Sequence, residues 1–392
     1  MTRPTRADLN TLRHHNRQVI VDIMRRYGSL SRAELARLTR LSKVTVSEVV
    51  DDLVAEGYLR AVGLGTADMG RKPMLMAFKE SAGFVLGIEV APRIVRLIVT
   101  DLMGDVVATF EESGVAAAGD DLIRALCALI SKARNHLPQS RYGLMAVGIA
   151  ISGWVDFAQG VVVAAPNMTW APLALQERLA SCVHVPIIVD NEANAALAYE
   201  HGHGILRDVD HAVYLSVGYG LGSGMLMNGA VYRGHKGMAG EMGHMVLDPA
   251  GPLCTCGNHG CWEMYSSEKA LQRMMSGCAP VLTVNEGDLT HWAIQQARQG
   301  APCARQALRA VGRSLGQGII NIANLLNPQT LVVGNGMVEA WEFLEPEMMA
   351  VLSQAGLSAT TQDLIVTPSP HYQDAAVRGA AALACDAVIA RI

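Results

Sequence analysis

The sequence predicts an α/β protein in which a small helical domain precedes two lobes of alternating strands and helices. Three observations predict this class. The 392-residue chain is 50% apolar and 17% charged, so it can bury the cores of two or three domains. Residues 1–80 carry 14 Lys and Arg against 9 Asp and Glu, whereas the remaining residues carry 18 against 27. From Gly83 onward, strand-like and helix-like segments alternate.

Several protein classes are excluded or disfavoured by composition. No run of 18 apolar residues is present, so we expect no transmembrane helix and no membrane partner. The basic N-terminus lacks a continuous apolar segment, so we expect no signal peptide. The eight Cys are unevenly spaced, which predicts no disulfide framework and favours the reducing cytoplasm.

Two helices are predicted first. The segment His14–Tyr27 ends at Gly28 and has one apolar face. That face consists of Val19, Ile20, Ile23 and Met24. Ser31 precedes Glu34 by three residues, a capping-box spacing that predicts a short second helix.

A third helix is predicted from its N-cap, Ser42, to about Glu56. Its expected buried face consists of Val46, Val49, Val50, Leu53 and Val54. Two helices joined by a tight turn form a helix-turn-helix, in which the start of the second helix reaches base edges in the major groove. The predicted DNA-contacting residues at this start are Ser42, Lys43, Thr45 and Ser47.

A β-hairpin is expected next, with strands at Tyr58–Val62 and Pro73–Phe78 around a glycine-rich turn. Arg71 and Lys72 lie at its base, where they suit phosphate or minor-groove contact. The alternative is a small helical protein-docking module. Charge, helix spacing and hairpin together favour an N-terminal winged helix-turn-helix over residues 1–80 that binds operator DNA.

Two rounds of strands and helices are predicted after Gly83. The first has strands at Phe84–Val90, Val95–Asp101, Val106–Glu111, Leu144–Ser152 and Pro186–Asp190, a β-pair near Val161, and helices at about Asp120–His136, Leu173–Ser181 and from Glu192. The second has strands at Ala212–Val217 and Leu331–Gly334 and helices near Ala304–Asn324 and from Ala375. This repetition predicts two related lobes around a cleft, residues 81–194 with 376–392 and residues 195–375. It is the architecture of the sugar kinase, heat-shock protein and actin group.

The stretch Gly240–Glu263 predicts a metal site. It contains one His and three Cys, namely His244, Cys254, Cys256 and Cys261. Zn²⁺ accepts three thiolates and one imidazole in a tetrahedron, and four protein ligands leave no open position for catalysis. We therefore predict structural Zn²⁺. His259 is the competing ligand, but the set is complete without it, so we expect it to be exposed.

This stretch resembles the signature of the ROK family (repressors, open reading frames and kinases), in which Glu and His precede Cys-x-Cys and a later Cys. Other family landmarks occur in order. Residues 190–194 (Asp-Asn-Glu-Ala-Asn) resemble the catalytic loop, residues 217–224 (Val-Gly-Tyr-Gly-Leu-Gly-Ser-Gly) the second phosphate loop, and residues 327–328 with 334–336 the adenosine region. The resemblance covers about residues 83–392, and ROK repressors carry a winged helix-turn-helix in front. It implies the two-lobed actin-like, sugar-kinase (ROK) fold.

Four positions depart from the pattern of the family's kinases. Residues 87–92 (Gly-Ile-Glu-Val-Ala-Pro) replace the phosphate loop Asp-x-Gly-Gly-Thr, and Pro92 has no N–H to donate to a phosphate. Glu192 replaces the catalytic Asp, Tyr219 a Thr, and Asn335 a Gly. Because phosphoryl transfer depends on positioning and charge stabilisation, these departures imply that the chain is not an enzyme. The alternative is a ROK sugar kinase with an appended DNA-binding domain.

The resemblance implies an intact sugar site. By position, a sugar would be bound by Gly153, Asn167, Asn191, Glu192, Glu241, His244 and Glu263. Fixed carboxylates and amides distinguish epimers, because a misplaced hydroxyl leaves a buried polar group unpaired. His244 can face zinc with one ring nitrogen and sugar with the other. The alternatives are a helix cap for Asn191 and Glu192, surface carboxylates for Glu241 and Glu263, a turn for Asn167 and a core position for Tyr219.

The resemblance therefore implies a cytoplasmic, sugar-responsive transcriptional repressor. Its expected partners are operator DNA, a sugar effector in the interlobe cleft and further copies of itself, in a dimer or a tetramer. A third hypothesis is that a protein such as a sugar-transport component sequesters it. The sequence leaves the sugar open among xylose, glucose, N-acetylglucosamine and others, and it leaves the operator and the direction of the response open as well.

Overall fold

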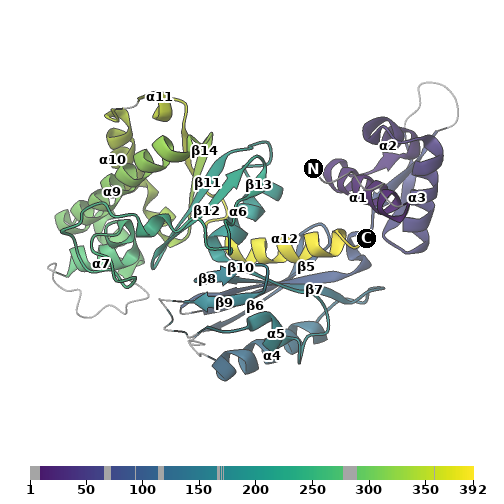
Figure 1. Cartoon of the computed structure of the whole chain (residues 1–392), viewed down its shortest axis with the longest axis horizontal. Helices are drawn as coiled ribbons and strands as arrows, with labels where there is room; N and C mark the ends of the chain where they lie inside the picture. The colour runs from purple at the N-terminus through teal and green to yellow at the C-terminus, as the bar shows by residue number, and fades with distance from the viewer. Residues whose placement is uncertain are drawn as a thin grey trace, which may run out of the picture.

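Three bodies, each with its own sheet, make up the chain (Figure 1). We call them the head, the first lobe and the second lobe. The computed structural model describes residues 9–65, 72–92, 94–113, 119–165, 168, 170, 172–276, 289–356 and 358–392. Among these residues, no helix is both long and apolar enough to cross a membrane.

The head contains three helices and a three-stranded sheet in the order β1-β3-β2. Its elements are α1 (Leu9–Tyr27), β1 (Leu30–Ser31), α2 (Arg32–Thr39), α3 (Lys43–Ala55), β2 (Leu59–Leu64) and β3 (Met74–Phe78). The capping box of Ser31 and Glu34 is present, and the Ser42 side chain accepts a hydrogen bond from the Thr45 N–H. The predicted hairpin forms between β2 and β3, and β1 adds a strand that the sequence pattern did not predict.

Two predictions for the head's helices need correction. Helix α1 begins at Leu9, five residues before the predicted His14. Val54, which the pattern put on the buried face of α3, is 40% exposed. In contrast, Val21 lies outside the predicted apolar face of α1 and is fully buried. The reason is that α1 packs against more than the head, as described below.

The first lobe is built on a five-stranded sheet in the order β10-β7-β4-β5-β6. Its elements are η1 (Glu80–Ala82), β4 (Phe84–Val90), β5 (Ile94–Asp101), β6 (Val106–Ser113), α4 (Gly119–Asn135), β7 (Leu144–Ile151), β8 (Trp154–Asp156), β9 (Val161–Ala164), α5 (Leu175–Leu179) and β10 (Ile187–Asn191). The predicted order of strands and helices is confirmed, although α5 is shorter than predicted. Helices α4 and α5 cover one face of the sheet (Figure 1).

The second lobe is built on the sheet β13-β12-β11-β14-β15. Its strands are β11 (Ala212–Val217), β12 (Leu221–Met227), β13 (Ala230–Val231), β14 (Thr330–Gly334) and β15 (Ile365–Pro368). Its helices are η2 (Met242–His244), η3 (Trp262–Met264), α7 (Glu268–Met275), α8 (Leu289–Arg298), α9 (Pro302–Leu326), η6 (Gly336–Ala340), α10 (Trp341–Ser353) and α11 (Ser358–Thr361). Buried residues of α7 to α10 form a core with one face of this sheet.

Two helices pass between the lobes: α6 (Glu192–Gly202) and α12 (Ala375–Ile389). They cross closely because small residues meet there. A Cβ on Gly379 of α12 would lie only 1.9 Å from the Ala195 carbonyl oxygen of α6. A Cβ on Gly148 of β7 would lie 1.8 Å from the Ala380 carbonyl oxygen. A larger residue at Gly379 would push α12 away from α6, and one at Gly148 would push α12 off the sheet of the first lobe.

The head shares a hydrophobic core with the first lobe and α12. Ile20, Val21 and Met24 of α1 belong to the same buried cluster as Val388 and Ile389 of α12. Gln18 donates a hydrogen bond to the Ala390 carbonyl (2.9 Å), and Arg25 lies 3.5 Å from Asp386. Tyr142 of the first lobe stacks on Tyr58 and donates to the Glu56 carbonyl (2.7 Å). The head is therefore packed against the first lobe and α12.

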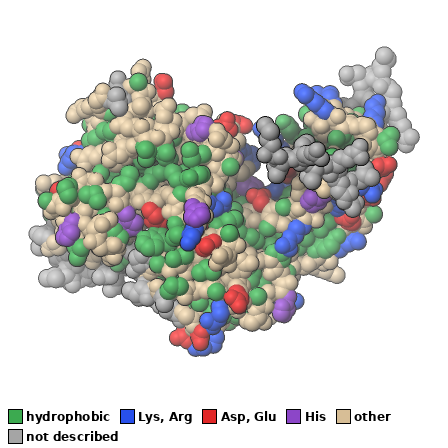
Figure 2. Space-filling view, in the orientation of Figure 1, with side chains coloured by type: hydrophobic (Ala, Val, Ile, Leu, Met, Phe, Trp, Pro, Cys, Tyr) green, Lys and Arg blue, Asp and Glu red, His purple; other side chains and the backbone are tan. Residues whose placement is uncertain are grey.

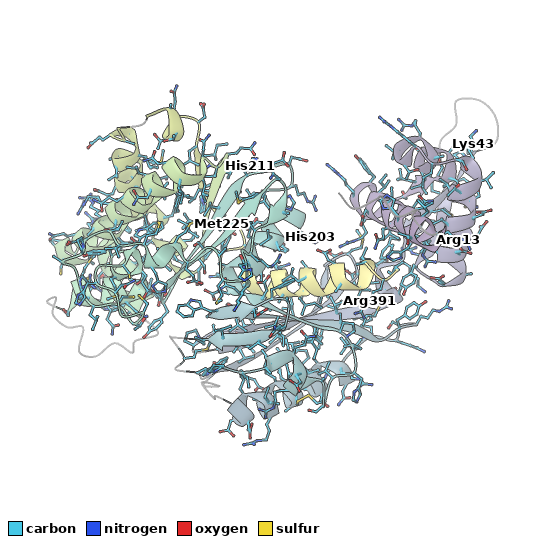
Figure 3. The ribbon with its side chains drawn as sticks, in the orientation of Figure 1. Arg13, Lys43, His203, His211, Met225 and Arg391 are labelled. Atoms are coloured by element: carbon cyan, nitrogen blue, oxygen red, sulfur yellow. A yellow bond between two sulfur atoms is a disulfide. The ribbon has the colours of Figure 1, made fainter. Side chains whose placement is uncertain are left out.

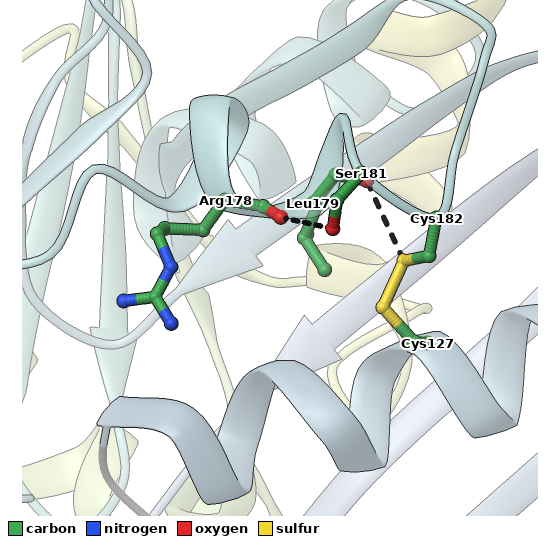
Figure 4. The surroundings of a disulfide bond; sticks show 5 residues. All are labelled: Cys127, Arg178, Leu179, Ser181 and Cys182. Atoms are coloured by element: carbon green, nitrogen blue, oxygen red, sulfur yellow. Dashed lines mark hydrogen bonds between the residues drawn. A yellow bond between two sulfur atoms is a disulfide. The ribbon is translucent and has the colours of Figure 1, made fainter.

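The prediction that the cysteines form no disulfide framework needs correction. Cys127 of α4 and Cys182, just after α5, form a disulfide with Cα atoms 6.0 Å apart (Figure 4). Cys303 is disulfide-bonded as well. Because 55 residues separate Cys127 from Cys182, their spacing carries no signal, and only the packing of α4 beside α5 brings them together.

Candidate functional site

A cavity of about 280 Å³ lies between the two lobes, and we call it the interlobe cavity. Six of the seven predicted sugar-binding residues line it, namely Gly153, Asn191, Glu192, Glu241, His244 and Glu263. The seventh, Asn167, lies outside the described residues. The first lobe contributes Gly153 and Asn191, and the second lobe contributes the stretch from Glu241 to Glu263. The structure thus brings together residues that lie up to 110 positions apart.

Two predicted residues at the start of α6 form part of the cavity wall. The Glu192 carboxylate accepts hydrogen bonds from Ser152 of the first lobe and from Ser216 of the second (3.3 Å), so it joins the two lobes. Burial raises the pKa of Glu192, and both hydroxyls oppose that rise. Asn191 caps α6 through its Oδ1 and donates to the Gly153 carbonyl (2.9 Å). The helix-cap interpretation of Asn191 is therefore confirmed, and its position on the cavity wall is compatible with it.

The sequence did not predict an ion pair that lies next to Asn191 of the cavity wall. Asp190 is fully buried, and its carboxylate lies 2.8 Å from the guanidinium of Arg233 in the second lobe. The Arg233 guanidinium also lies over the Phe157 ring, 4.0 Å from its centroid. The pair ties the lobes together next to Asn191. No sequence signal could have paired residues 43 positions apart.

The His244 ring stands between the cavity and the cysteines. Its Nδ1 lies 3.6 Å from the Cys254 sulfur, and its Nε2 lies 3.9 Å from the Glu241 carboxylate. Trp154, another residue that sequence reasoning missed, meets the ring edge-to-face at 6.4 Å. The Glu241 side chain is 38% exposed; partial desolvation at the cavity raises its pKa, and a hydrogen bond with Trp154 opposes the rise. One imidazole nitrogen thus faces the sulfur cluster and the other faces the cavity.

The predicted metal ligands form a compact cluster. Ligand atoms of His244, Cys254, Cys256 and Cys261 all lie within 4.8 Å of one another. Tetrahedral zinc, with Zn–S bonds of about 2.3 Å, puts two sulfurs ~3.8 Å apart and a nitrogen ~3.5 Å from a sulfur. The sulfurs of Cys256 and Cys261 are 3.5 Å apart, and His244 Nδ1 is 3.6 Å from the Cys254 sulfur. The four residues fit one tetrahedral ion, and His259 is exposed as expected.

The loop that carries these ligands depends on local geometry. Gly260 has a φ of +66°, and a Cβ there would lie 1.6 Å from the Asp248 carbonyl oxygen. Glu263 follows the last cysteine and is only 4% exposed. Its carboxylate lies 3.0 Å from the Cys254 sulfur and 4.0 Å from His244 Nδ1. The surface-carboxylate alternative is therefore wrong for Glu263, which lies between the cluster and the cavity.

The positions that we predicted to depart from the kinase pattern also line the cavity. They are Glu89, Ala91, Pro92, Glu192, Tyr219 and Asn335. The Asn335 side chain donates to Ser216 (3.0 Å) and accepts from the Gly336 N–H (2.7 Å), so it fills space where a glycine would leave room. Tyr219 is half-buried at the cavity, with the Lys269 ammonium 4.8 Å from its ring centroid, so the core-aromatic alternative is wrong.

The predicted DNA-contacting residues lie on the surface of the head. Ser42 and Lys43 are exposed at the start of α3, and Thr45 and Ser47 are half-buried. Figure 3 places Lys43 on the side of the head away from the lobes, and Figure 2 shows Lys and Arg side chains at that end. Val44, which sequence reasoning passed over, is 67% exposed. Lys72 is exposed, whereas Arg71 lies outside the described residues. We call Ser42, Lys43, Val44 and Lys72 the outer face of the head.

Comparison with known proteins agrees with this architecture. The ROK family profile matches residues 85–387. The xylose repressor of Bacillus subtilis strain 168 is 32% identical over 384 residues, which are 97% of this chain and 97% of that protein. The crystal structure of a ROK family transcriptional regulator, a homologue of the E. coli MLC protein, has a TM-score of 0.83 at 25% identity and covers 97% of each chain. A ROK family glucokinase from Streptomyces griseus, in complex with glucose and AMPPNP, has a TM-score of 0.68 at 27% identity and covers 77% of this chain and 99% of that chain. These likenesses confirm the predicted two-lobed fold.

Proposed function

Because this chain belongs to the ROK family, we propose that it is a transcriptional repressor that binds operator DNA with its head and a sugar in the interlobe cavity. One observation carries the proposal. The same chain combines an exposed helix start on the head with a cavity lined by Asn191, Glu192, Glu241, His244 and Glu263. Carboxylates, an amide and an imidazole in fixed positions can donate to and accept from the hydroxyls of a sugar.

The cysteine cluster binds Zn²⁺ in this proposal. Three thiols and an imidazole nitrogen at tetrahedral spacing are the donor set that zinc prefers. Zinc bound there stabilises the loop and supplies no open coordination position for chemistry. The residues of this chain do the rest: the cluster fixes the His244 ring so that Nε2 points toward the cavity and Glu241. It also fixes Glu263 at the cavity wall.

The cavity binds sugar without phosphorylating it in this proposal. Pro92 and Ala91 lie where the family's kinases have glycines, so the wall offers fewer backbone N–H groups to a phosphate. The Glu192 carboxylate is already engaged with Ser152 and Ser216, so it is a poor general base for a sugar hydroxyl. Full-length similarity to a protein named xylose repressor supports the same conclusion.

The contacts of the head with α12 and with the segment after α6 connect the sugar site to the DNA-binding surface. Helix α6 begins at the cavity with Glu192, and the segment after it reaches the head, where Asp208 lies 3.3 Å from Arg26. Helix α12 crosses α6 through Gly379 and shares a core with α1. A change in lobe closure that moves α6 against α12 therefore moves the head. The sugar must bind one closure state more tightly than the other, because otherwise no shift occurs.

Assembly makes such a movement effective. A helix-turn-helix dimer needs its two recognition helices about one DNA turn apart, ~34 Å. We propose that two copies bind one operator, as a dimer or as half of a tetramer. A displacement of a few ångströms between the heads then weakens or strengthens operator binding.

A mobility-shift titration on the chain's native promoter tests the proposal. The full-length protein is titrated onto the DNA with xylose, glucose or N-acetylglucosamine, and separately with ATP. We expect one sugar to change the DNA affinity at least tenfold and ATP to change nothing. The proposed repressor function is wrong if no sugar changes the DNA affinity and the protein instead transfers phosphate from ATP to a sugar.

A further inference from the structure

A buried carboxylate with one weakly satisfied oxygen lines the interlobe cavity. Glu89 of β4 lines the cavity and is only 7% exposed. Its Oε2 has no hydrogen-bond partner among the described residues. Arg96 lies 3.5 Å from that oxygen, but its guanidinium donates to the Gln373 carbonyl (2.8 Å) and to Glu111 (3.4 Å) instead. At 3.5 Å the ion pair with Arg96 satisfies this oxygen only weakly, so a ligand group that donates a short hydrogen bond to it would be stabilising.

The strand order separates Glu89 from β10, the strand that ends at Asn191 of the proposed sugar site. The sheet runs β10-β7-β4-β5, and its register places Ala150 of β7 level with Asp190 on one side and with Glu89 on the other. Level residues on neighbouring strands point to the same face, so both carboxylates point toward the second lobe. Two strand spacings, about 10 Å, therefore separate Glu89 from β10, whose last residue, Asn191, lines the cavity. That span exceeds one pyranose ring and suits two linked rings.

The charges around Glu89 select the kind of ligand. The cavity is lined by the carboxyl groups of Glu89, Glu192, Glu241, Glu263 and Glu268 and by one guanidinium, that of Arg96, which lies beside Glu89. A phosphate group would meet only one cationic side chain, Arg96, among these carboxyl groups, so little of its charge would be neutralised in a partly desolvated site. A neutral hydroxyl needs no such neutralisation and can donate to Glu89. Tyr219 adds a half-buried aromatic side chain, which can pack against the apolar face of a sugar ring.

We propose that Glu89 and Tyr219 form a second sugar subsite, so that the preferred effector is a disaccharide. This inference rests on the proposed function. The first sugar unit occupies the part of the cavity next to Asn191, Glu241 and His244. The second unit occupies the part that corresponds by position to the kinase phosphate loop, and one of its hydroxyls donates to Glu89.

Calorimetric titration of the full-length, zinc-loaded protein tests this subsite. The probes are matched pairs of D-xylose with β-1,4-xylobiose and D-glucose with cellobiose. In one pair we expect the disaccharide to bind at least tenfold more tightly than the monosaccharide. Glu89→Ala should remove that advantage and leave the monosaccharide affinity within about twofold. Glu89→Gln, which keeps the side-chain volume, is the substitute if the Ala variant does not fold. It should at least halve the logarithm of the ratio between disaccharide and monosaccharide affinity.

The control variant is Glu241→Ala, which should weaken both members of the pair equally. The subsite is refuted if a monosaccharide binds as tightly as its disaccharide, or if the Glu89 variants weaken both members to the same extent. In either case the proposed function survives, because a sugar still binds. If none of the four sugars binds, the proposed function fails together with the subsite.

Discussion

The interlobe cavity and the outer face of the head present their functional side chains in opposite ways. In the cavity, Glu263 and Glu89 are buried and Glu192 is half-buried, and they are positioned by strands, helix ends and the cysteine cluster. On the head, Lys43 and Val44 are exposed on the first turn of one short helix. Buried polar groups discriminate strongly, because a wrong ligand leaves them unpaired. Exposed charges bind DNA phosphates with an affinity that depends on salt. We therefore expect large effects from changes in the cavity and small, salt-dependent effects from changes on the head.

The largest effect is expected at the cysteine cluster. Cys256→Ser removes one of the four ligand atoms that lie within 4.8 Å of one another. We expect loss of the metal, a fall in unfolding free energy of at least about 3 kcal/mol, and no stabilisation by the effector sugar. Metal analysis and thermal unfolding with and without sugar measure all three. Cys385→Ala, at a buried thiol outside the cluster, should keep the metal and the sugar response. An unchanged sugar response in metal-free Cys256→Ser would separate zinc from ligand binding.

The next-largest effect is a pH dependence of the free energy of unfolding, which arises from Glu89 in the cavity. Burial raises the pKa of Glu89 to about 7, with Arg96 opposing and Glu192 and Asp374 adding to the rise. The folded chain keeps this proton up to about pH 7, whereas the unfolded chain releases it above its ordinary value of 4.5. The associated stability is full below that value and is lost as pH rises through 7, by at most about 3 kcal/mol at pH 8.

Glu89→Gln cannot titrate, so it should lose less stability than the native chain between pH 5 and pH 8. Urea unfolding of both proteins at the two pH values measures the difference. Equal losses in the two proteins would mean that Glu89 stays ionised over the whole range.

A somewhat smaller effect is expected for sugar affinity. Glu241→Ala should weaken binding of the effector about 30-fold, because it removes a hydrogen-bonding carboxylate worth ~2 kcal/mol from the cavity wall. DNA affinity without sugar should stay unchanged, since Glu241 lies in the second lobe. Calorimetry and a mobility-shift assay measure the two quantities. Glu177→Gln, at an exposed carboxylate on α5, is the control. A loss of DNA affinity in Glu241→Ala would contradict the separation of cavity and head.

The outer face of the head should respond weakly and in two different ways. Lys43→Ala should weaken operator binding about fivefold at 0.15 M salt and lower the slope of log affinity against log salt by about one. Val44→Ser should leave that slope unchanged and reduce discrimination between operator and random DNA, because Val44 carries no charge. Binding titrations at several salt concentrations separate the two effects. Lys132→Ala, at an exposed lysine on α4, should change neither.

The smallest effect is expected where the head meets the body. Gln18→Ala combined with Arg25→Ala removes three polar contacts of α1, with Ala390, Asp386 and Cys385 at the C-terminal part of α12, and leaves the shared apolar core. Each contact is worth at most about 1 kcal/mol. We expect DNA and sugar affinities within about twofold of the native values, and a sugar effect on DNA binding that is about threefold smaller. Arg13→Ala, at an exposed position on the same helix, is the control. If the sugar effect is unchanged, the polar contacts do not carry the coupling.

Much of the head followed from local sequence signals. The capping box at Ser31 and the N-cap at Ser42 were predicted correctly because each depends on residues three positions apart. The burial of Val21 was not predicted, because periodicity identified only the face that packs inside the head. The second face of α1 is covered by α12, which lies more than 350 positions away in the sequence.

The candidate site likewise contains residues that the sequence predicted and residues that it did not. Spacing alone predicted that His244, Cys254, Cys256 and Cys261 would meet, and the structure places them together. The resemblance to the ROK family supplied Glu192 and Glu241, which a spacing argument could not connect. Arg233 and Trp154 were missed because their partners, Asp190 and His244, lie 43 and 90 positions away.

By itself, the sequence determined the features that short-range chemistry controls: the helix caps, the start of the third helix, the alternation of strands and helices, and the cysteine cluster. Only the tertiary structure decided which distant residues became neighbours. The order β10-β7-β4-β5 set Glu89 about two strand spacings from Asp190. The packing of α4 beside α5 joined Cys127 to Cys182, and that of α1 on α12 seated the head. The reason is physical: caps and ligand loops are closed by a few residues of chain, whereas lateral neighbours depend on how whole elements share a core.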